Sequence, residues 1–167
     1  MIGLVGDDDA GRRLVAELVS EGVSTACVMI SDTHQTGSAV IMVDTHGEKQ
    51  IMVAPGANGG LLIPNVRSAE PTIATTSVLV TQLEVPLDAT IEACQIARES
   101  ETIVILDAAT ASPLPSELLV NVDIIRCNAH EAEAITSIPV TDESTAMRAT
   151  DVLMRYGVEV AIVQAGY

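Results

Sequence analysis

Residues 36–58, TGSAVIMVDTHGEKQIMVAPGAN, decide the fold, because they alternate like a β-hairpin inside a chain that otherwise alternates between helix and strand patterns. Ser38, Val40 and Met42 fall on one side of a predicted strand, and the residues between them fall on the other. Residues 44–49 carry turn chemistry, and residues 50–54 predict a second strand. We therefore expect a small hairpin, inserted early in an α/β domain, with one face left to cover something.

Aliphatic runs at regular intervals predict the other strands, and the segments between them keep helical spacing. Asp8 or Asp9 is suited to cap the first helix, and Gly22 is suited to end it. The predicted strands are residues 2–5, 25–30, 78–82, 103–107, 122–127 and 160–164, and the predicted helices are 87–98, 116–120, 129–135 and 143–156. Strands that alternate with helices predict right-handed crossovers and a three-layer α/β fold, a parallel sheet with helices on both faces.

Composition limits the classes of partner. The 167 residues fit one domain. A net charge of −15, with Lys49 as the only lysine, argues against binding a nucleic acid through counterion release. About 18 consecutive apolar residues would indicate a membrane span, and the sequence has no such run. We therefore expect neither a nucleic acid nor a membrane as a partner.

The three cysteines indicate the compartment. Cys27, Cys94 and Cys127 are odd in number and far apart, and their spacing suits neither a disulfide framework nor a zinc site. A reduced cytoplasm is the compartment that this pattern predicts.

Several motifs extend the pattern beyond the hairpin. With VGDDDAG at residues 5–11, QLE at 82–84 and NAHE at 128–131, the hairpin closely resembles the ribokinase branch of the phosphofructokinase B family of sugar kinases. In that family such a hairpin is a lid over the sugar. The resemblance implies a lid at residues 35–58 inserted into an α/β core of residues 1–34 and 59–167.

The resemblance also implies roles for the residues that match the family's motifs. Ligands of open α/β sheets bind at the carboxyl ends of the strands. The implied sugar contacts are Thr36 and Ala39 in the lid and Glu84, whose carboxylate would accept a hydrogen bond from a sugar hydroxyl. Asn128, Asp107, Gln164 and Gly166 would lie at the nucleotide, and Glu131 would hold Mg²⁺ through water.

Two of these assignments have particular features. Asn128 and Glu131 also satisfy the pattern of a helix capping box, and the capping and cofactor roles can hold together. Gln164 stands where the family usually has a threonine whose hydroxyl meets a phosphate, which bears on the affinity for ATP. His130 is interpreted as a solvated helix residue rather than a ligand.

The implied activity is transfer of the γ-phosphoryl group of ATP to a pentose, with ribose O5 as the preferred acceptor. ATP and Mg²⁺ are the expected cofactors, K⁺ is a further candidate, and a homodimer through the lid is expected. The family's catalytic aspartate belongs to a G-A-G-D element that the sequence lacks. We expect that aspartate beyond residue 167, in a longer protein of which this chain is an internal fragment without activity of its own.

Three alternatives remain at this point. The chain can belong to a kinase for another sugar or for a nucleoside. It can be a catalytically inactive module for sugar binding or dimerisation, because the hairpin offers an apolar face. It can also be an unrelated doubly wound binding domain with a chance hairpin.

Overall fold

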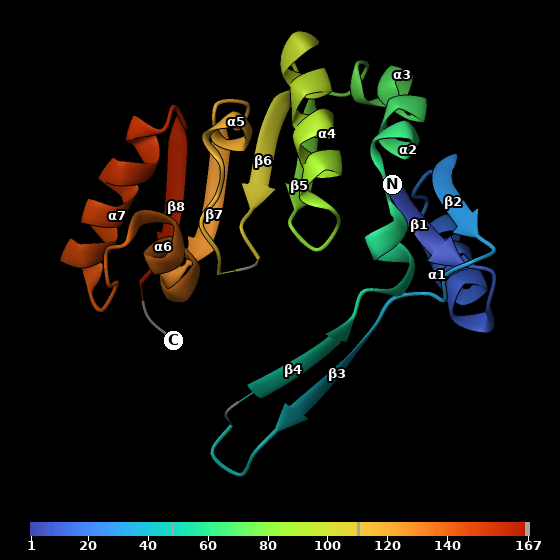
Figure 1. Cartoon of the computed structure of the whole chain (residues 1–167), viewed down its shortest axis with the longest axis horizontal. Coiled ribbons are helices and arrows are strands. Elements are labelled where there is room, and N and C mark those ends of the chain that lie inside the picture. Colours follow the sequence, from blue (N-terminus) through green and yellow to red (C-terminus); the bar gives the residue numbers. More distant parts are fainter. Residues whose placement is uncertain (48, 110, 166–167) are drawn as a thin grey trace. The chain divides into compact units, whose positions relative to one another are not determined.

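The computed structural model describes residues 1–47, 49–109 and 111–165 (Figure 1). The chain divides into two compact units, Met1–Ser68 and Ala69–Tyr167. The first unit contains two two-stranded sheets, the second contains one four-stranded sheet, and each unit has its own buried residues.

The first unit begins with a β-α-β element. β1 (Ile2–Gly6) and β2 (Cys27–Ser31) are parallel, and α1 (Asp9–Ser20) connects them. The side chain of Asp8 caps α1, and Gly22 follows the helix with a φ of 77°. The predicted first strand, helix cap and helix stop are thus confirmed.

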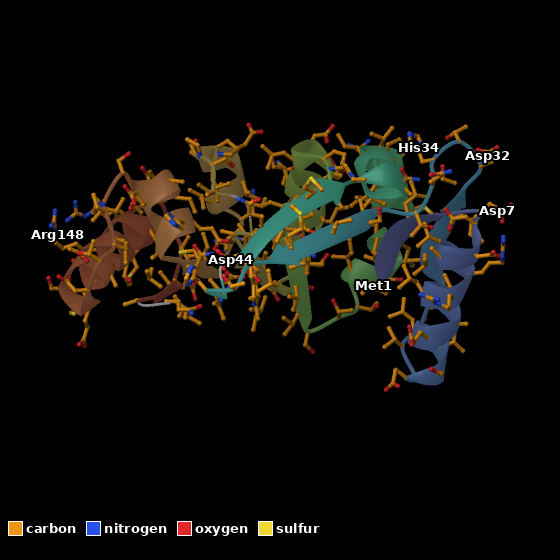
Figure 2. All side chains as sticks on the ribbon, turned by 90° about the horizontal axis from the view of Figure 1, so that it is seen from below. Met1, Asp7, Asp32, His34, Asp44 and Arg148 are labelled. Atoms are coloured by element: carbon orange, nitrogen blue, oxygen red, sulfur yellow. The ribbon has the colours of Figure 1, made fainter. Side chains whose placement is uncertain are left out.

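The predicted hairpin is confirmed as β3 (Ser38–Val43) and β4 (Lys49–Ala54), two antiparallel strands that Figure 1 shows as an extended ribbon. Asp44, labelled in Figure 2, lies at its tip, just after β3. Every residue of both strands is exposed. A two-stranded hairpin alone is at best marginally stable in water, and this one exposes apolar side chains on both faces.

Three short helices after the hairpin were not predicted. They are the 3₁₀-helix η1 (Gly56–Gly60), α2 (Ile63–Ser68) and α3 (Glu70–Ile73), and they bury Ala57, Val66 and Ile73. Elements of four to six residues are too short for a helical period to show in the sequence. η1 contacts β1, so the segment that leaves the hairpin is held against the sheet of the first unit.

The second unit contains a parallel sheet in the order β5-β6-β7-β8. These strands are β5 (Val78–Gln82), β6 (Ile103–Asp107), β7 (Ile124–Asn128) and β8 (Val160–Gln164). Three of them have the predicted bounds. β7 begins later than predicted, because Val122 is buried in the preceding turn and the Asp123 carboxylate accepts a hydrogen bond from the backbone N–H of Val104 at 2.7 Å.

Helices cover one face of this sheet. The helices are α3 (Glu70–Ile73), α4 (Leu87–Glu99), α5 (Ser116–Leu119), α6 (Ala129–Thr136) and α7 (Glu143–Arg155). When strands follow one another in sequential order, right-handed crossovers place every connecting helix on the same face. The burial agrees: Leu106 and Ile125 are fully buried on that face, whereas Ile103 on the other is 47% exposed.

The opposite face of the sheet is apolar and exposed among the described residues. Its side chains include Val78, Val80, Ile103, Val160 and Ile162. The α/β class and the parallel sheet are therefore confirmed, and the helices that the structure describes in this unit lie on one side of that sheet. None of the described helices combines the length and apolar character needed to cross a bilayer.

Candidate functional site

The root of the hairpin is a dense hydrogen-bonded junction around Asp8 and Thr36. The Thr36 hydroxyl donates to Asp8 Oδ1 at 2.6 Å, and the Thr36 backbone N–H donates to Asp8 Oδ2 at 2.8 Å. The Gly11 N–H also donates to Asp8 Oδ1, at 2.8 Å. These bonds, that of the Thr36 hydroxyl first, lower the pKa of Asp8 to about 2, because they stabilise the carboxylate form.

The hydroxyl of Thr36, a predicted sugar contact, is engaged on two sides. It donates to Asp8 and accepts from the backbone N–H of Gly6 at 3.0 Å. A hydroxyl has one proton to donate, so Thr36 can meet a sugar hydroxyl only as an acceptor. Ala39, the other predicted lid contact, is exposed on β3 opposite Val53.

The faces of the hairpin differ in chemistry. Because side chains alternate along a strand, Ala39 shares a face with Ile41 and Val43, and the register adds Lys49, Ile51 and Val53 to it. The other face carries Ser38, Val40, Met42, Gln50, Met52 and Ala54. The implied sugar contact and the most aliphatic surface of the hairpin therefore lie on the same side.

Glu84, the third predicted sugar contact, lies in the second unit, in the loop between β5 and α4. Its side chain is exposed. Because Glu84 comes two residues after the end of β5, it lies at the carboxyl edge of the sheet, as Asn128 does at the end of β7. Both therefore belong to the edge at which open α/β sheets bind ligands.

Polar side chains end three adjacent strands at that edge. Asp107 ends β6, Asn128 ends β7 and Gln164 ends β8, and Asn128 pairs with Gln164 in the register. These are three of the four residues predicted at the nucleotide, and the sheet brings them together. The fourth, Gly166, lies outside the described residues.

Arg126 links two of these residues and was missed by the sequence analysis. Its Nη1 donates to Asp107 Oδ1 at 3.2 Å and its Nη2 to Gln164 Oε1 at 2.9 Å. It lies two residues before Asn128 on β7, so the two side chains fall on one face of the sheet. The signal in the sequence was a single positive charge within a predicted strand, two positions before a predicted ligand residue.

Asn128 and Glu131 form a complete capping box at the start of α6. The side-chain oxygen Oδ1 of Asn128 accepts a hydrogen bond from the backbone N–H of Glu131 at 3.0 Å. The Glu131 carboxylate accepts from the backbone N–H of Asn128 at 2.8 Å and from its side-chain amide at 2.7 Å. Glu131 is only 7% exposed, so this reciprocal pair fixes the amide and the carboxylate in one orientation at the strand end.

Two cysteine side chains of the second unit are buried. Burial is the main factor that raises the pKa of the Cys127 thiol, to about 11, so it stays protonated and poorly nucleophilic at neutral pH. Burial likewise raises the pKa of Cys94 to about 12. Within the described residues, Cys27, Cys94 and Cys127 form no disulfide. His130 is exposed, in agreement with its interpretation as a solvated residue.

Within the described residues, no three His, Cys, Asp or Glu side chains gather to hold a metal ion. Mg²⁺ in phosphate-handling sites is usually held by one or two carboxylates, several waters and the phosphates of the substrate. A single buried carboxylate such as Glu131, pointing to the strand end, fits the outer position of such an arrangement.

Comparison with known proteins identifies relatives along the whole chain. The model of the pfkB family carbohydrate kinases matches residues 1–167. A ribokinase of Haemophilus influenzae is 36% identical over 165 residues, which are 99% of this chain and 54% of that protein. A ribokinase of Schizosaccharomyces pombe is 33% identical over 166 residues, 98% of this chain and 52% of that protein.

Solved structures agree with these matches. The structure of Arabidopsis thaliana ribokinase complexed with ribose and ATP superposes with a TM-score of 0.86 at 26% identity, covering 97% of this chain and 53% of that one. This chain therefore spans about half the length of the relatives that it matches.

Proposed function

Because this chain belongs to the pfkB family of carbohydrate kinases, we propose that the protein of which it forms a part transfers the γ-phosphoryl group of ATP to a pentose, most favourably to O5 of ribose. The observation that carries the proposal is the alignment of Asp107, Asn128 and Gln164 at the carboxyl edge of a parallel sheet. The relatives named ribokinase, at 33–36% identity, support ribose as the sugar.

The proposed contacts to the sugar are Thr36 and Ala39 in the hairpin and Glu84 in the second unit. Residues 35–58 act as a lid on a core made of residues 1–34 and 59–167. Glu84 accepts a hydrogen bond from a sugar hydroxyl, Thr36 offers only an acceptor, and Ala39 contributes apolar contact. A lid that covers the sugar excludes water and so limits hydrolysis of ATP.

The nucleotide end is formed by the strand tips of the second unit. Asn128 donates to the phosphates with the amide hydrogen that Glu131 does not use, and Asp107 and Gln164 flank it. Glu131 would hold Mg²⁺ through a water, and K⁺ is a further candidate at the site. When bound, Mg²⁺ neutralises charge on the transferred phosphoryl group.

The reaction requires a general base for the sugar hydroxyl. The bond between O5 and phosphorus forms as the bond to the β-phosphate oxygen breaks, ADP leaves, and the hydroxyl proton passes to an aspartate. We place this aspartate in the part of the protein that corresponds to the unmatched half of the relatives. We accordingly expect these 167 residues alone to lack kinase activity.

The test is an assay of ADP release by the intact, folded protein with ribose, fructose and adenosine as acceptors. Release with ribose above the other two is expected. Preference for fructose or adenosine would select the alternative of another sugar or nucleoside as substrate. Equal inactivity on all three acceptors would overturn the kinase assignment.

A second candidate is a catalytically inactive module for sugar binding or dimerisation. The exposure of every residue in β3 and β4 favours it, because such a surface suits a second copy of the hairpin. Ribose binding by a folded dimer without any release of ADP would support this candidate over the kinase.

A further inference from the structure

Asp8 makes more contacts than a helix cap needs. A cap requires one side-chain acceptor for an N–H of the first turn, and the bond from Gly11 supplies it. Asp8 also accepts both the backbone N–H and the hydroxyl of Thr36, which lies 28 residues further along the chain. One carboxylate thus ties the start of α1 to the segment that enters the hairpin.

The same three segments also pack closely against one another. A Cβ at Gly6 would lie 2.5 Å from the Thr36 backbone nitrogen and 2.6 Å from the His34 carbonyl oxygen. A Cβ at Gly11 would lie 2.8 Å from Thr36 Oγ1 and would also meet the Gly6 carbonyl oxygen. The end of β1, the start of α1 and the segment before β3 are therefore packed so closely that neither Gly6 nor Gly11 leaves room for a Cβ.

The segment that leaves the hairpin is tied to the segment that enters it. The Ala57 N–H donates to the Gln35 carbonyl oxygen at 2.7 Å. Gly56 has a φ of 52°, which an L side chain rarely adopts, and a Cβ there would meet the same Gln35 oxygen. A Cβ at Gly37 would lie 2.6 Å from the Pro55 carbonyl oxygen. Both ends of the hairpin are thus fixed at its root.

We propose that Asp8 is a positioning residue that locks the root of the hairpin, residues 35–37 and 55–57, to the N-terminus of α1. The lock sets the direction in which the hairpin leaves the first unit and confines bending to β3 and β4 beyond the root. Its consequence for catalysis, a lid that reaches the sugar in a fixed direction, rests on the proposed function; the lock itself does not.

The proposal predicts a measurable distribution of distances inside the first unit. Spin labels are placed on Glu17→Cys in α1 and on Thr45→Cys in the hairpin turn, with Cys27 changed to Ala in every sample. Pulsed electron resonance then reports the width of the distance distribution between the labels. In the parent protein we expect a narrow distribution, and in Asp8→Asn and Thr36→Val a broader one.

Two matched variants control this experiment. Asp9→Asn removes a neighbouring exposed carboxylate that pairs with Arg12 but does not contact Thr36, and it should leave the distribution narrow. Thr36→Ser keeps the hydroxyl and should also leave it narrow. Unchanged width in folded Asp8→Asn and Thr36→Val would overturn the lock, as would broadening or loss of the fold in Thr36→Ser.

A kinetic measurement separates the lock from the proposed function. In the active, intact protein, Asp8→Asn should raise the KM for the sugar more than it lowers kcat, and Asp9→Asn should leave both at their parental values. If the protein has no kinase activity but the distances respond as expected, the lock stands and the proposed function fails. If KM and kcat are unchanged while the distances broaden, the lock has no role in catalysis and the positioning assignment is overturned.

Discussion

The Nη2 of Arg126 lies 2.9 Å from the Oε1 of Gln164, so a side chain of β7 is tied to the last residue of β8. The same guanidinium reaches Asp107 at the end of β6, at 3.2 Å. Three strands are therefore connected through one side chain at the edge that we propose to bind the nucleotide. This link makes Arg126 a candidate for holding Asp107 and Gln164 in place.

Replacing Arg126 by Met should weaken the binding of ATP with little loss of stability. The side chains of Arg126 and Asp107 are 43% and 45% exposed, and exposed ion pairs contribute at most about 1 kcal/mol to folding. The measurement is calorimetric titration of the protein with Mg-ATP, beside chemical denaturation of the same samples. Arg98→Met is the matched control, because Arg98 pairs with Asp123 before the start of β7. Equal loss of affinity in both variants would contradict the assignment.

The stabilising effect of Asp8 should depend on pH only in strong acid. Its pKa in the folded protein, about 2, is below its ordinary value of 3.8, so the contribution is present above the ordinary value and is lost as the pH falls through the lowered one. Urea denaturation of the parent and Asp8→Asn from pH 7 to pH 2 checks this. The difference between the two should stay constant above about pH 5 and shrink below the ordinary pKa. If the difference in unfolding free energy is as large at pH 2 as at pH 7, the hydrogen bonds to the Asp8 carboxylate do not account for it.

Asn128→Ser should separate the two roles of Asn128. Serine caps helices about as well as asparagine, whereas alanine at this position typically costs about 1 kcal/mol. We therefore expect Asn128→Ser to retain the unfolding free energy of the parent but to bind ATP more weakly, because the side-chain amide is lost. Asn128→Ala should lose both stability and affinity for ATP. If Asn128→Ser binds ATP as the parent does, the residue serves only as a cap.

The two faces of the hairpin should respond differently to charge. Ile41→Asp and Val43→Asp place carboxylates on the aliphatic face and should abolish the proposed dimer, because charges buried in an apolar contact are costly and Lys49, opposite Val43, can pair with only one of them. Val40→Asp and Met42→Asp place the same charges on the other face and should leave the dimer intact. Sedimentation velocity measures the outcome. Loss of the dimer in the second pair alone would assign the contact to the face that carries Met52.

Substitutions on the two faces of the sheet in the second unit should differ in their effect on the free energy of unfolding. Leu106 is fully buried against the helices, so Leu106→Ala should cost about 2–5 kcal/mol. Val80 is 69% exposed on the opposite face, and Val80→Ala should change the unfolding free energy by no more than about 0.5 kcal/mol. Chemical denaturation of both variants of the 167-residue chain tests this. A large loss for Val80→Ala would show that its face is covered in solution.

The sequence predicted the elements well where a single period lasted long enough. The bounds of β5, β6 and β8 agree with the prediction, because each is a short aliphatic run between clear breakers. η1, α2 and α3 were missed, since none of them completes enough turns to show a period. The hairpin strands β3 and β4 and the turn between them could be predicted, because alternation and turn residues are local properties.

The candidate site was predicted only in part. Asp107, Asn128 and Gln164 were found because each ends a predicted strand, and strands in parallel bring their carboxyl ends to one edge. Arg126 was missed, since its partners lie 19 and 38 residues away and only the register of the sheet brings them within reach. The roles of the site residues themselves stay predictions.

By itself, then, the sequence determined which segments are strands, which are helices and which residues stand at their ends, because these depend on neighbours within a few positions. Only the tertiary structure decided that the hydroxyl of Thr36 is engaged by Asp8 and that the connecting helices lie on one face of the second sheet. Both depend on contacts between segments far apart in the chain. Backbone packing and the handedness of crossovers set such contacts, and no local pattern of side chains records them.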